Sequence, residues 1–435
     1  MAEIRPFRGV YYNQSLVGNL SDIICPPYDI INPQLEEELY QRSKYNFVRI
    51  EYNRKLPQDS DTDNRYTRSG DKLKQWLEQK VLITSKIPAI YVYDHYFNSQ
   101  GKEYRRRGLI VRVKIEEWHK NIIRPHEGTL AEAKSDRINL LETIKANTSS
   151  IMSLYEDREK RLASLLESQK TDNILISTKD DNGERHEVWQ VDEPKAVSEI
   201  CDNFADKALY IADGHHRYES ALVYKRQMLA GSSAARENAA FNFVMMTLVE
   251  FNDPGLIILP PHRLLRGLPE SKLAGLCDKL ESFFDIECLS LDMPDLWQRV
   301  DGLLADKSKV KMILFGPDRQ NLSLLTLRDI AAADRMIPYF HSEIYKRLDV
   351  SIVDHVILEE LLGLSSEDEI KISYNYDRRD AVNGVLNKEY QLAFIVSPVK
   401  AETIKEIADA GDRMPRKSTY FYPKLPSGLI INRLV

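Results

Sequence analysis

The chain has 435 residues, of which 43% are hydrophobic and 29% are charged, and it carries a net charge of −6. This composition excludes a disordered chain and predicts an ordinary soluble protein of two or three domains. The acidic balance argues against a nucleic-acid partner, because clustered Lys and Arg are needed to bind a phosphate backbone. We interpret the densest basic run, Arg105–Arg107, as a solvated strand edge, with an anionic ligand as the alternative.

The cysteines and the apolar segments indicate where the protein works. Cys25, Cys201, Cys277 and Cys288 are far apart and form no CxxC pair, so neither a disulfide framework nor a zinc ribbon is predicted. The N-terminal stretch MAEIRPFRGVYY lacks the apolar core of a signal peptide. No apolar run approaches the ~18 residues that are needed to span a bilayer. We therefore expect a cytoplasmic protein without a membrane partner.

Residues 1–120 are expected to form an N-terminal mixed α/β region. Apolar runs predict strands over residues 46–52 (NFVRIEY), 89–97 and 106–115, and periodic apolar residues predict a helix over 68–79.

Residues 121–250 are expected to form a nucleotide-binding core. Residues 209–211 read as a short buried strand, and Ala221, Tyr224 and Met228 recur with the spacing of an amphipathic helix. The Asp-Gly pair between them, at 213 and 214, predicts a turn, so the segment forms a strand, a turn and a helix. The long apolar run FNFVMMTLVEF that follows is read as a buried strand.

The residues at this turn are suited to an anion. His215, His216 and Arg217 would occupy the first turn of the helix, where free N–H groups and the helix dipole favour negative charge. Arg217 could bind a phosphate through two hydrogen bonds, although solvated side chains after a common turn are the alternative. Zinc is disfavoured, because adjacent residues on a helix point about 100° apart.

A second polar block, RPHEGT, covers residues 124–129 and precedes a predicted helix at about 130–145. It places His126 and Glu127 immediately before that helix. A carboxylate there usually stabilises the helix start. The alternative is a general base that accepts the proton of a substrate hydroxyl.

Residues 251–345 predict a smaller α/β segment. Helices are expected over 270–284 and 293–305, and strands over 310–316 and 322–327.

Two further groups are candidate anion contacts. His262 and Arg263 repeat the His-Arg pairing and could make additional phosphate contacts. In the last region, residues 346–435, a strand over 390–398 and a helix ending at Gly411 precede a polar loop. The loop residues Arg416, Lys417, Ser418 and Thr419 offer cations and hydroxyls that would suit a carboxylate or a phosphate, and Tyr420–Tyr422 read as a core strand.

Six blocks resemble the signature of a large bacterial and archaeal family of conserved proteins of unknown function. They are RPFRG, CPPYDII, RPHEGTLAEAKSDRINLL, ADGHHRYESAL, LPPHRLL and MPRKSTYFYPKLPSG, and they span residues 5–428. This resemblance covers nearly the whole chain and implies no activity.

A more distant resemblance supplies a chemistry. LYIADGHHRY is similar to the phosphate-binding strand, turn and helix of the ParB/sulfiredoxin fold, and within that fold the free-serine kinases carry Pro-His-Glu, Asp-Gly-His-His-Arg and Pro-Lys-hydroxyl-hydroxyl blocks in the order found here. The resemblance implies a mixed α/β fold with a ParB/sulfiredoxin-like core and additional α/β segments. It also implies a nucleotide donor, ATP or ADP, with Mg²⁺.

The resemblance assigns roles position by position. Glu127, with His126 beside it, matches the catalytic glutamate block, Asp213–Arg217 match the phosphate block, and Ser418 and Thr419 match the hydroxyl pair near the substrate. Asp213 could in addition hold Mg²⁺ directly or through water.

The chain also departs from the kinases. It has 85 residues between Glu127 and Asp213, and Tyr420 and Phe421 stand where the kinases resemble an Arg-His pair. Sulfiredoxin activity is excluded, because His215 occupies the position of the required cysteine.

These patterns favour a kinase that phosphorylates a small-molecule hydroxyl, with free L-serine as the leading acceptor. A nucleotide-binding regulatory protein without catalysis is the main alternative, and a non-catalytic scaffold is a third.

Overall fold

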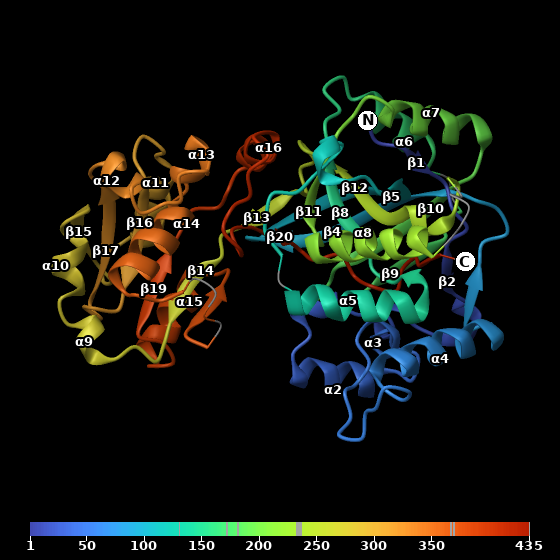
Figure 1. Ribbon diagram of the computed structural model, residues 1–435, viewed down its shortest axis with the longest axis horizontal. Coiled ribbons are helices and arrows are strands. Elements are labelled where there is room, and N and C mark those ends of the chain that lie inside the picture. The colour runs from blue at the N-terminus through green and yellow to red at the C-terminus, as the bar shows by residue number, and fades with distance from the viewer. Residues whose placement is uncertain are drawn as a thin grey trace. The chain divides into compact units, whose positions relative to one another are not determined.

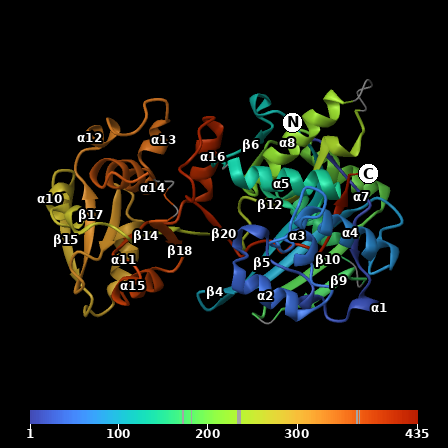
Figure 2. The same ribbon diagram turned by 60° about the horizontal axis from the view of Figure 1, so that its bottom comes forward.

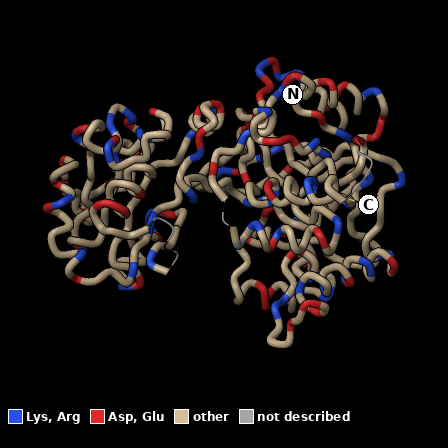
Figure 3. The backbone as a smooth tube through the Cα atoms, in the orientation of Figure 1, with Lys and Arg blue, Asp and Glu red and all other residues tan. Residues whose placement is uncertain are grey.

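The computed structural model describes residues 1–129, 131–170, 173–180, 182–231, 237–365, 368 and 370–434 (Figure 1). The chain forms two compact units. The first comprises Met1–Pro125, Thr129–Ile257 and Pro423–Val435, and the second comprises His126–Gly128 and Ile258–Tyr422. The four segments predicted from the sequence are thus grouped into two units, and the mixed α/β class is confirmed. Basic and acidic residues are interspersed along both units (Figure 3).

The first unit contains a mixed sheet with the strand order β6-β11-β8-β12-β5-β4-β10-β9, and β1 pairs with β5. The pairs β6–β11 and β8–β12 are parallel, and the other pairs are antiparallel. The strands are β1 (Ile4–Arg5), β4 (Ile90–Ser99), β5 (Lys102–Lys114), β6 (Ile123–Arg124), β8 (Ile151–Tyr155), β9 (Ile176–Lys179), β10 (Arg185–Val191), β11 (Leu209–Asp213) and β12 (Phe243–Glu250). Two short pairs join β2 (Val10–Tyr12) to β3 (Leu82–Thr84) and β7 (Ala146–Asn147) to β21 (Asn432–Arg433).

Helices of the first unit bury their apolar faces against this sheet and against one another. Residues of α6, α7 and α8 join the strands in one apolar core. Helix α5 lies beside α8 in both ribbon views (Figures 1 and 2). The helices are α1 (Gln14–Val17), α2 (Pro33–Arg42), α3 (Val48–Glu51), α4 (Arg65–Glu78), α5 (Ala131–Ile144), α6 (Arg161–Ser168), α7 (Pro194–Phe204) and α8 (His215–Ala230), with 3₁₀ turns at η1 (Leu20–Asp22), η2 (Tyr28–Ile30), η3 (Trp118–Lys120) and η4 (Ala240–Asn242).

The strand predicted over residues 46–52 is wrong, because the chain forms the helical turn α3 there. Asn46 explains the difference. Its side chain accepts a hydrogen bond from the amide of Val48 and donates to the carbonyls of Asp22 and Ile24, which turns the chain away from an extended path. Since α3 is buried almost all round, its apolar run has no helical period that a sequence pattern could reveal.

The interpretation of Arg105–Arg107 as a solvated edge is also wrong for two of its three residues. Strand β5 lies between β12 and β4 in the interior of the sheet, and only Arg105 is exposed. Arg107 binds both carboxylate oxygens of Asp94, at 2.7 and 2.8 Å. Burial alone would raise the pKa of Asp94, but Arg107 outweighs burial and lowers it. Arg106 is 1% exposed and donates to the carbonyl of Pro423 at 2.7 Å.

The second unit contains an antiparallel sheet in the order β15-β17-β16-β19-β14-β18. Helices α11 and α15 pack on one of its faces. The strands of this sheet are β14 (His262–Leu265), β15 (Phe284–Ser290), β16 (Lys311–Phe315), β17 (Asn321–Leu327), β18 (Ile372–Asn375) and β19 (Leu392–Ile395). A separate two-stranded sheet pairs β13 (Ile257–Leu259) with β20 (Tyr420–Tyr422). The helices are α9 (Glu270–Leu273), α10 (Leu276–Leu280), α11 (Leu296–Ala305), α12 (Ile330–Asp334), α13 (Glu343–Lys346), α14 (Asp349–Ser351), the π-helix η5 (Ile352–Leu361), α15 (Arg378–Leu386) and α16 (Ala401–Asp409).

The single helix predicted over residues 270–284 is divided into α9 and α10. Gly275 lies between them with a φ of +80°, a left-handed conformation that ends the first helix. The predicted helix end at Gly411 is confirmed, since this residue follows α16 with a φ of +70°. No helix in the described ranges is long and apolar enough to cross a membrane.

Gly255 tests the close packing around β5. A Cβ at this position would lie 2.6 Å from backbone atoms of Arg105 and Arg106, which cannot move without displacing the strand. We expect Gly255→Ala to lower the free energy of unfolding by about 1–3 kcal/mol. Urea denaturation measures this change.

Gly302→Ala in α11 is the matched control, because a Cβ there meets no atom within 4 Å. We expect this helical substitution to be neutral or to stabilise the protein by about 0.5–1 kcal/mol. Equal stability of Gly255→Ala and the wild type would show that β5 tolerates the added methyl group.

Candidate functional site

The predicted strand, turn and helix around residue 213 form as expected. Strand β11 ends at Asp213, Gly214 has a φ of +94°, and α8 begins at His215. A Cβ on Gly214 would lie 2.8 Å from Nε of Arg217, so the turn requires glycine both for its backbone conformation and for space. On α8, Ala221 is buried as predicted, whereas Met228 near the end of the helix is exposed.

The carboxylate of Asp213 binds two cations. Its Oδ2 accepts a hydrogen bond from Nη2 of Arg217 at 2.6 Å, and its Oδ1 accepts one from Nζ of Lys424. Arg217 also donates to the carbonyl of Ser150 at 2.6 Å. Burial alone would raise the pKa of Asp213, but the Lys424 ammonium and the Arg217 guanidinium outweigh burial and hold it well below its ordinary value.

This group, which we call the Asp213 cluster (Asp213, Arg217 and Lys424), has the charge of an anion site. Two cations and one carboxylate give a net charge of +1. The cluster lies where α8 begins, and no side chain caps that helix end. Nε of Arg217 is buried and has no hydrogen-bond partner within the described parts of the chain. Cations, helix dipole and an unsatisfied donor together suit a phosphate group.

The predicted role of Asp213 as a ligand for Mg²⁺ does not fit this arrangement. Both of its oxygens bind cationic side chains, and the surrounding charge is positive rather than negative. A divalent cation binds where anionic oxygens are in excess. The carboxylate therefore orients Arg217 and Lys424.

In the second unit, Glu127 contacts the loop that carries Ser418 and Thr419. Its Oε1 accepts hydrogen bonds from the amide of Ser418 at 3.2 Å, the amide of Thr419 at 3.1 Å and the hydroxyl of Thr419 at 2.8 Å. Lys417, just before these amides, has a φ of +55°. Successive amides after a left-handed residue form a concave anion site. The loop thus binds a carboxylate, as its residue types suggest, and that carboxylate belongs to Glu127.

His126 and Ser418 support this contact from buried positions. Nε2 of His126 lies 3.0 Å from the hydroxyl oxygen of Thr419. Because that hydroxyl donates to Glu127, the His126 nitrogen is the donor, and the three side chains form a chain from His126 through Thr419 to Glu127. Ser418 is buried and donates to the carbonyl of Pro415 at 2.5 Å. We call His126, Glu127, Ser418 and Thr419 the Glu127 cluster.

Four further predicted site residues lie in the second unit, two on this loop and two on β14. Arg416 is partly buried, and Lys417 is exposed on the loop before Ser418. His262 and Arg263 are buried, and Arg263 binds both oxygens of Asp354 at 3.1 Å. Because Arg263 is already paired with Asp354 and both predicted residues are buried, we leave His262 and Arg263 out of the proposed phosphate site.

A buried group on the first sheet, His95, Glu184 and His186, has the residue types of a metal site but a different hydrogen-bond pattern. Arg106 lies 3.2 Å from Nδ1 of His95 and can only donate, so Nδ1 is the acceptor. Nε2 of His95 then carries the proton and donates to Glu184 at 2.8 Å. Burial lowers the pKa of His186 to about 3, so this ring is neutral. The group links the buried charge of Arg106 to Glu184.

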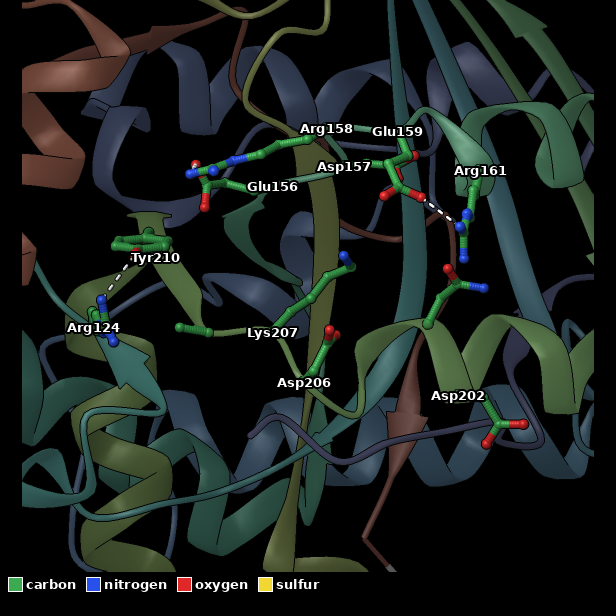
Figure 4. Close-up of a pocket in the computed structure, with 12 residues that line it drawn as sticks. Arg124, Glu156, Asp157, Arg158, Glu159, Arg161, Asp202, Asp206, Lys207 and Tyr210 are labelled. Carbon is green, nitrogen blue, oxygen red and sulfur yellow. Dashed lines mark hydrogen bonds and ion pairs between the residues drawn. The ribbon is translucent and has the colours of Figure 1, made fainter.

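A cavity of about 700 Å³ lies in the first unit near the start of β11 (Figure 4). Figure 4 shows Arg124 beside Tyr210, whose hydroxyl accepts a hydrogen bond from Arg124 at 2.9 Å. Both basic and acidic side chains line the cavity, among them Lys207 and Asp206. It is lined by none of the predicted site residues.

Lys424 is a member of the Asp213 cluster that the sequence analysis did not predict. It lies in the block YPKLPSG, 211 residues after its partner Asp213. Its occurrence in a motif block was a signal, but no local spacing connects it to β11.

Comparisons with known proteins give a family and distant structural likenesses. The profile of a family described as "Protein of unknown function (DUF1015)" matches residues 4–351. No curated protein matches the sequence. Among solved structures, a conserved hypothetical protein from Pyrococcus furiosus is similar, with 12% identity and a TM-score of 0.35 over 75% of this chain and 95% of that chain.

Two further solved structures are similar at the same level. A free serine kinase in complex with AMP has 13% identity and a TM-score of 0.35 over 74% of this chain and 92% of that chain. SbnI with a C-terminal truncation, from Staphylococcus aureus, has 8% identity and a TM-score of 0.33 over 74% of this chain and 87% of that chain. At these identities and TM-scores, the likenesses say nothing about the activity of this chain.

Asp213→Asn tests the Asp213 cluster. The variant leaves Arg217 and Lys424 without a counter-charge, and we expect the free energy of unfolding at neutral pH to fall by about 3–5 kcal/mol. Because the pKa of Asp213 is lowered by folding, the wild-type stabilisation is present above the unfolded pKa and is lost as the pH falls. The difference between the two proteins should therefore be constant above about pH 5 and decrease below about pH 4.

Urea denaturation over this pH range measures the difference. Glu159→Gln, which removes an exposed carboxylate paired with Arg161, is the control and should change stability little. A difference that does not depend on pH would show that the Asp213 charge contributes nothing to stability.

Proposed function

Because the chain belongs to the DUF1015 family, whose function is unknown, we propose an activity from its own residues. The protein is a nucleotide-dependent kinase that transfers a phosphoryl group to the hydroxyl of a small molecule, and free L-serine is the leading acceptor. The observation that carries this proposal is the net positive Asp213 cluster at the uncapped start of α8. The Pro-His-Glu and Asp-Gly-His-His-Arg blocks resemble those of free-serine kinases, and this resemblance suggests phosphoryl transfer to L-serine as the reaction.

In the proposed reaction, the Asp213 cluster binds the phosphates of ATP or ADP. The N–H groups of His215 and His216 at the start of α8 and the guanidinium of Arg217 are the donors. Lys424 adds a second positive charge, and Asp213 keeps both cations in place before the nucleotide arrives. Such preorganised charge supplies most of what phosphoryl transfer requires. Mg²⁺ would enter with the nucleotide and be held by its phosphates.

Glu127 is the proposed base. The acceptor hydroxyl oxygen forms a bond to the terminal phosphorus, the bond from phosphorus to the bridging oxygen breaks, and its electron pair leaves with the nucleotide. The hydroxyl proton passes to Glu127. Three hydrogen bonds hold Oε1, whereas no described residue hydrogen-bonds Oε2, so the carboxylate is oriented and one oxygen can accept the proton. His126 and Thr419 are positioning residues.

Arg416 and Lys417 are the proposed contacts for the acceptor's own carboxylate. They precede the Ser418 and Thr419 amides, and Lys417 is exposed. Residues 419–424 connect the Glu127 cluster to Lys424 in the sequence, so one short segment carries residues of both clusters.

A nucleotide-binding regulatory protein is the second candidate. One observation favours it: the contacts of Glu127 with the Thr419 loop also serve as a structural anchor that needs no catalysis. The two candidates separate in one assay, in which the pure protein is incubated with ATP or ADP, Mg²⁺ and a panel of hydroxy compounds headed by L-serine. A kinase yields a phosphorylated product by mass spectrometry, whereas a regulatory protein binds nucleotide and yields none.

Glu127→Gln tests the base. The amide keeps an oxygen that can accept the three loop hydrogen bonds but cannot take up the proton, so we expect turnover to fall by about 10²–10⁴-fold. Nucleotide affinity, measured by calorimetry, should not change. The control is Glu343→Gln, which alters an exposed carboxylate paired with Lys346. Turnover equal to that of the wild type would remove Glu127 from the reaction.

Lys424→Gln tests the phosphate site. The loss of one charge-assisted contact should weaken ADP binding by about 10–100-fold, which corresponds to about 1.5–3 kcal/mol. Lys424→Arg keeps the charge and should recover most of the affinity. Lys145→Gln, at an exposed lysine of the same unit, is the control. If all three variants bind ADP as tightly as the wild type, the nucleotide does not bind at this cluster.

A further inference from the structure

The second unit contains a cavity of about 560 Å³ that no predicted site residue lines. Its walls come from the end of α11 and the loop after it, from the residues that follow β17 and β19, and from α13 and α14. Because β17 and β19 both run antiparallel to β16, the C-terminal ends of β17 and β19 lie beside the N-terminal end of β16. The volume is within the range of sites for small organic ligands.

Positive side chains predominate around this cavity. Its cationic lining residues are Lys307, Lys309, Lys311, Arg328, Arg347 and Lys400, against the two carboxylates of Asp306 and Asp349. Lys311 pairs with Asp306, and Arg328 pairs with Asp285 outside the cavity. No ion pair to a described residue is formed by Lys307, Lys309, Arg347 or Lys400. Such an excess of unpaired cations is unexpected in a chain with a net charge of −6.

The carboxylate of Asp349 keeps its negative charge, but both of its oxygens bind the backbone, and six cations against two carboxylates still leave the lining net positive. Its Oδ1 accepts a hydrogen bond from the amide of Val350 at 2.8 Å, and its Oδ2 accepts one from the amide of Ser397 at 2.7 Å. Asp349 therefore joins α14 to the segment that leads into α16. A ligand in this cavity would therefore be surrounded by net positive charge.

The lining of the cavity also includes apolar side chains. Leu304, Leu327, Leu348 and Val399 line it and are buried. A lining with both apolar and cationic side chains complements a molecule that has both an apolar body and an anionic group, rather than a free inorganic ion.

The start of α16 adds to the positive field on one side. This nine-residue helix begins at Ala401 after Lys400, and no side chain caps its first N–H groups. Thr403 in its first turn lines the cavity. Uncapped N–H groups and the helix dipole favour negative charge at the same wall as the Lys400 ammonium.

We propose that this cavity is a ligand site for an organic anion, a small molecule with a phosphate or carboxylate group on an apolar body. It is formed entirely by residues of the second unit and shares none with the Asp213 cluster or the Glu127 cluster. Its ligand is therefore a molecule bound in addition to the proposed kinase substrates, and the site stands whether or not the protein is a kinase.

The test uses the full-length protein and the fluorescent probe 8-anilinonaphthalene-1-sulfonate, which has an aromatic body and one anionic group. Lys307→Glu/Lys400→Glu reverses two charges at the cavity, and Lys279→Glu/Lys388→Glu reverses two exposed lysines of the same unit away from it. We expect about tenfold weaker probe binding in the cavity variant only, and weaker wild-type binding at high salt. Equal affinity of the two variants would overturn the proposal.

Displacement of the probe identifies the anionic group. 1-Naphthyl phosphate and 2-naphthoate carry a phosphate and a carboxylate on the same apolar ring, and 2-naphthol is the uncharged match. We expect at least one of the two anions to displace the probe at lower concentration than 2-naphthol does. The anion that displaces the probe at the lower concentration shows whether the site prefers a phosphate or a carboxylate group. If 2-naphthol displaces the probe as well as either anion, the cavity is an apolar depression and not an anion site.

Discussion

In the first unit, buried charged side chains bind partners among the last residues of the chain. Asp213 holds Lys424, and the carbonyl of Pro423 accepts a hydrogen bond from Arg106 in the interior of the sheet. Removal of the Asp213 carboxylate would leave Arg217 and Lys424 without their counter-charge, which costs several kcal/mol in a low-dielectric interior. Loss of the Pro423 carbonyl would remove a hydrogen-bond acceptor of buried Arg106. The C-terminal segment is therefore part of the electrostatic structure of the unit.

Helices, strands and turns could be predicted from the sequence where the residues that determine them lie within the same short segment. The strand, turn and helix over residues 209–230 combine an apolar run, an Asp-Gly pair and a helical period, and each signal is complete within its own segment. The prediction failed where the determining contact is distant. Arg107 looks solvated in the sequence because Asp94 lies on the neighbouring strand, and α3 looks extended because Asn46 binds carbonyls of residues 22 and 24.

The candidate site was predicted in part for the same reason. The residue types in the loop before Thr419 indicate a carboxylate site, but a sequence pattern cannot state which carboxylate occupies it, and in the structure it is that of Glu127. The far end of this loop is anchored as well. Asp412 accepts hydrogen bonds from the amide of Ser342 at 2.7 Å and from Nδ1 of His341 at 2.8 Å. The loop is thus held at both ends by hydrogen bonds.

Residues His126–Gly128 belong to the second unit, although the sequence on both sides of them belongs to the first. Within the second unit, the amide of Met414 donates to the carbonyl of His126 at 2.7 Å, and the carboxylate of Glu127 occupies the amides of the Thr419 loop. A gene fragment that encodes residues 258–422 would omit this tripeptide and leave those donors to water. The second unit is therefore not encoded by one continuous stretch of the sequence, because three of its residues lie more than a hundred positions before the rest.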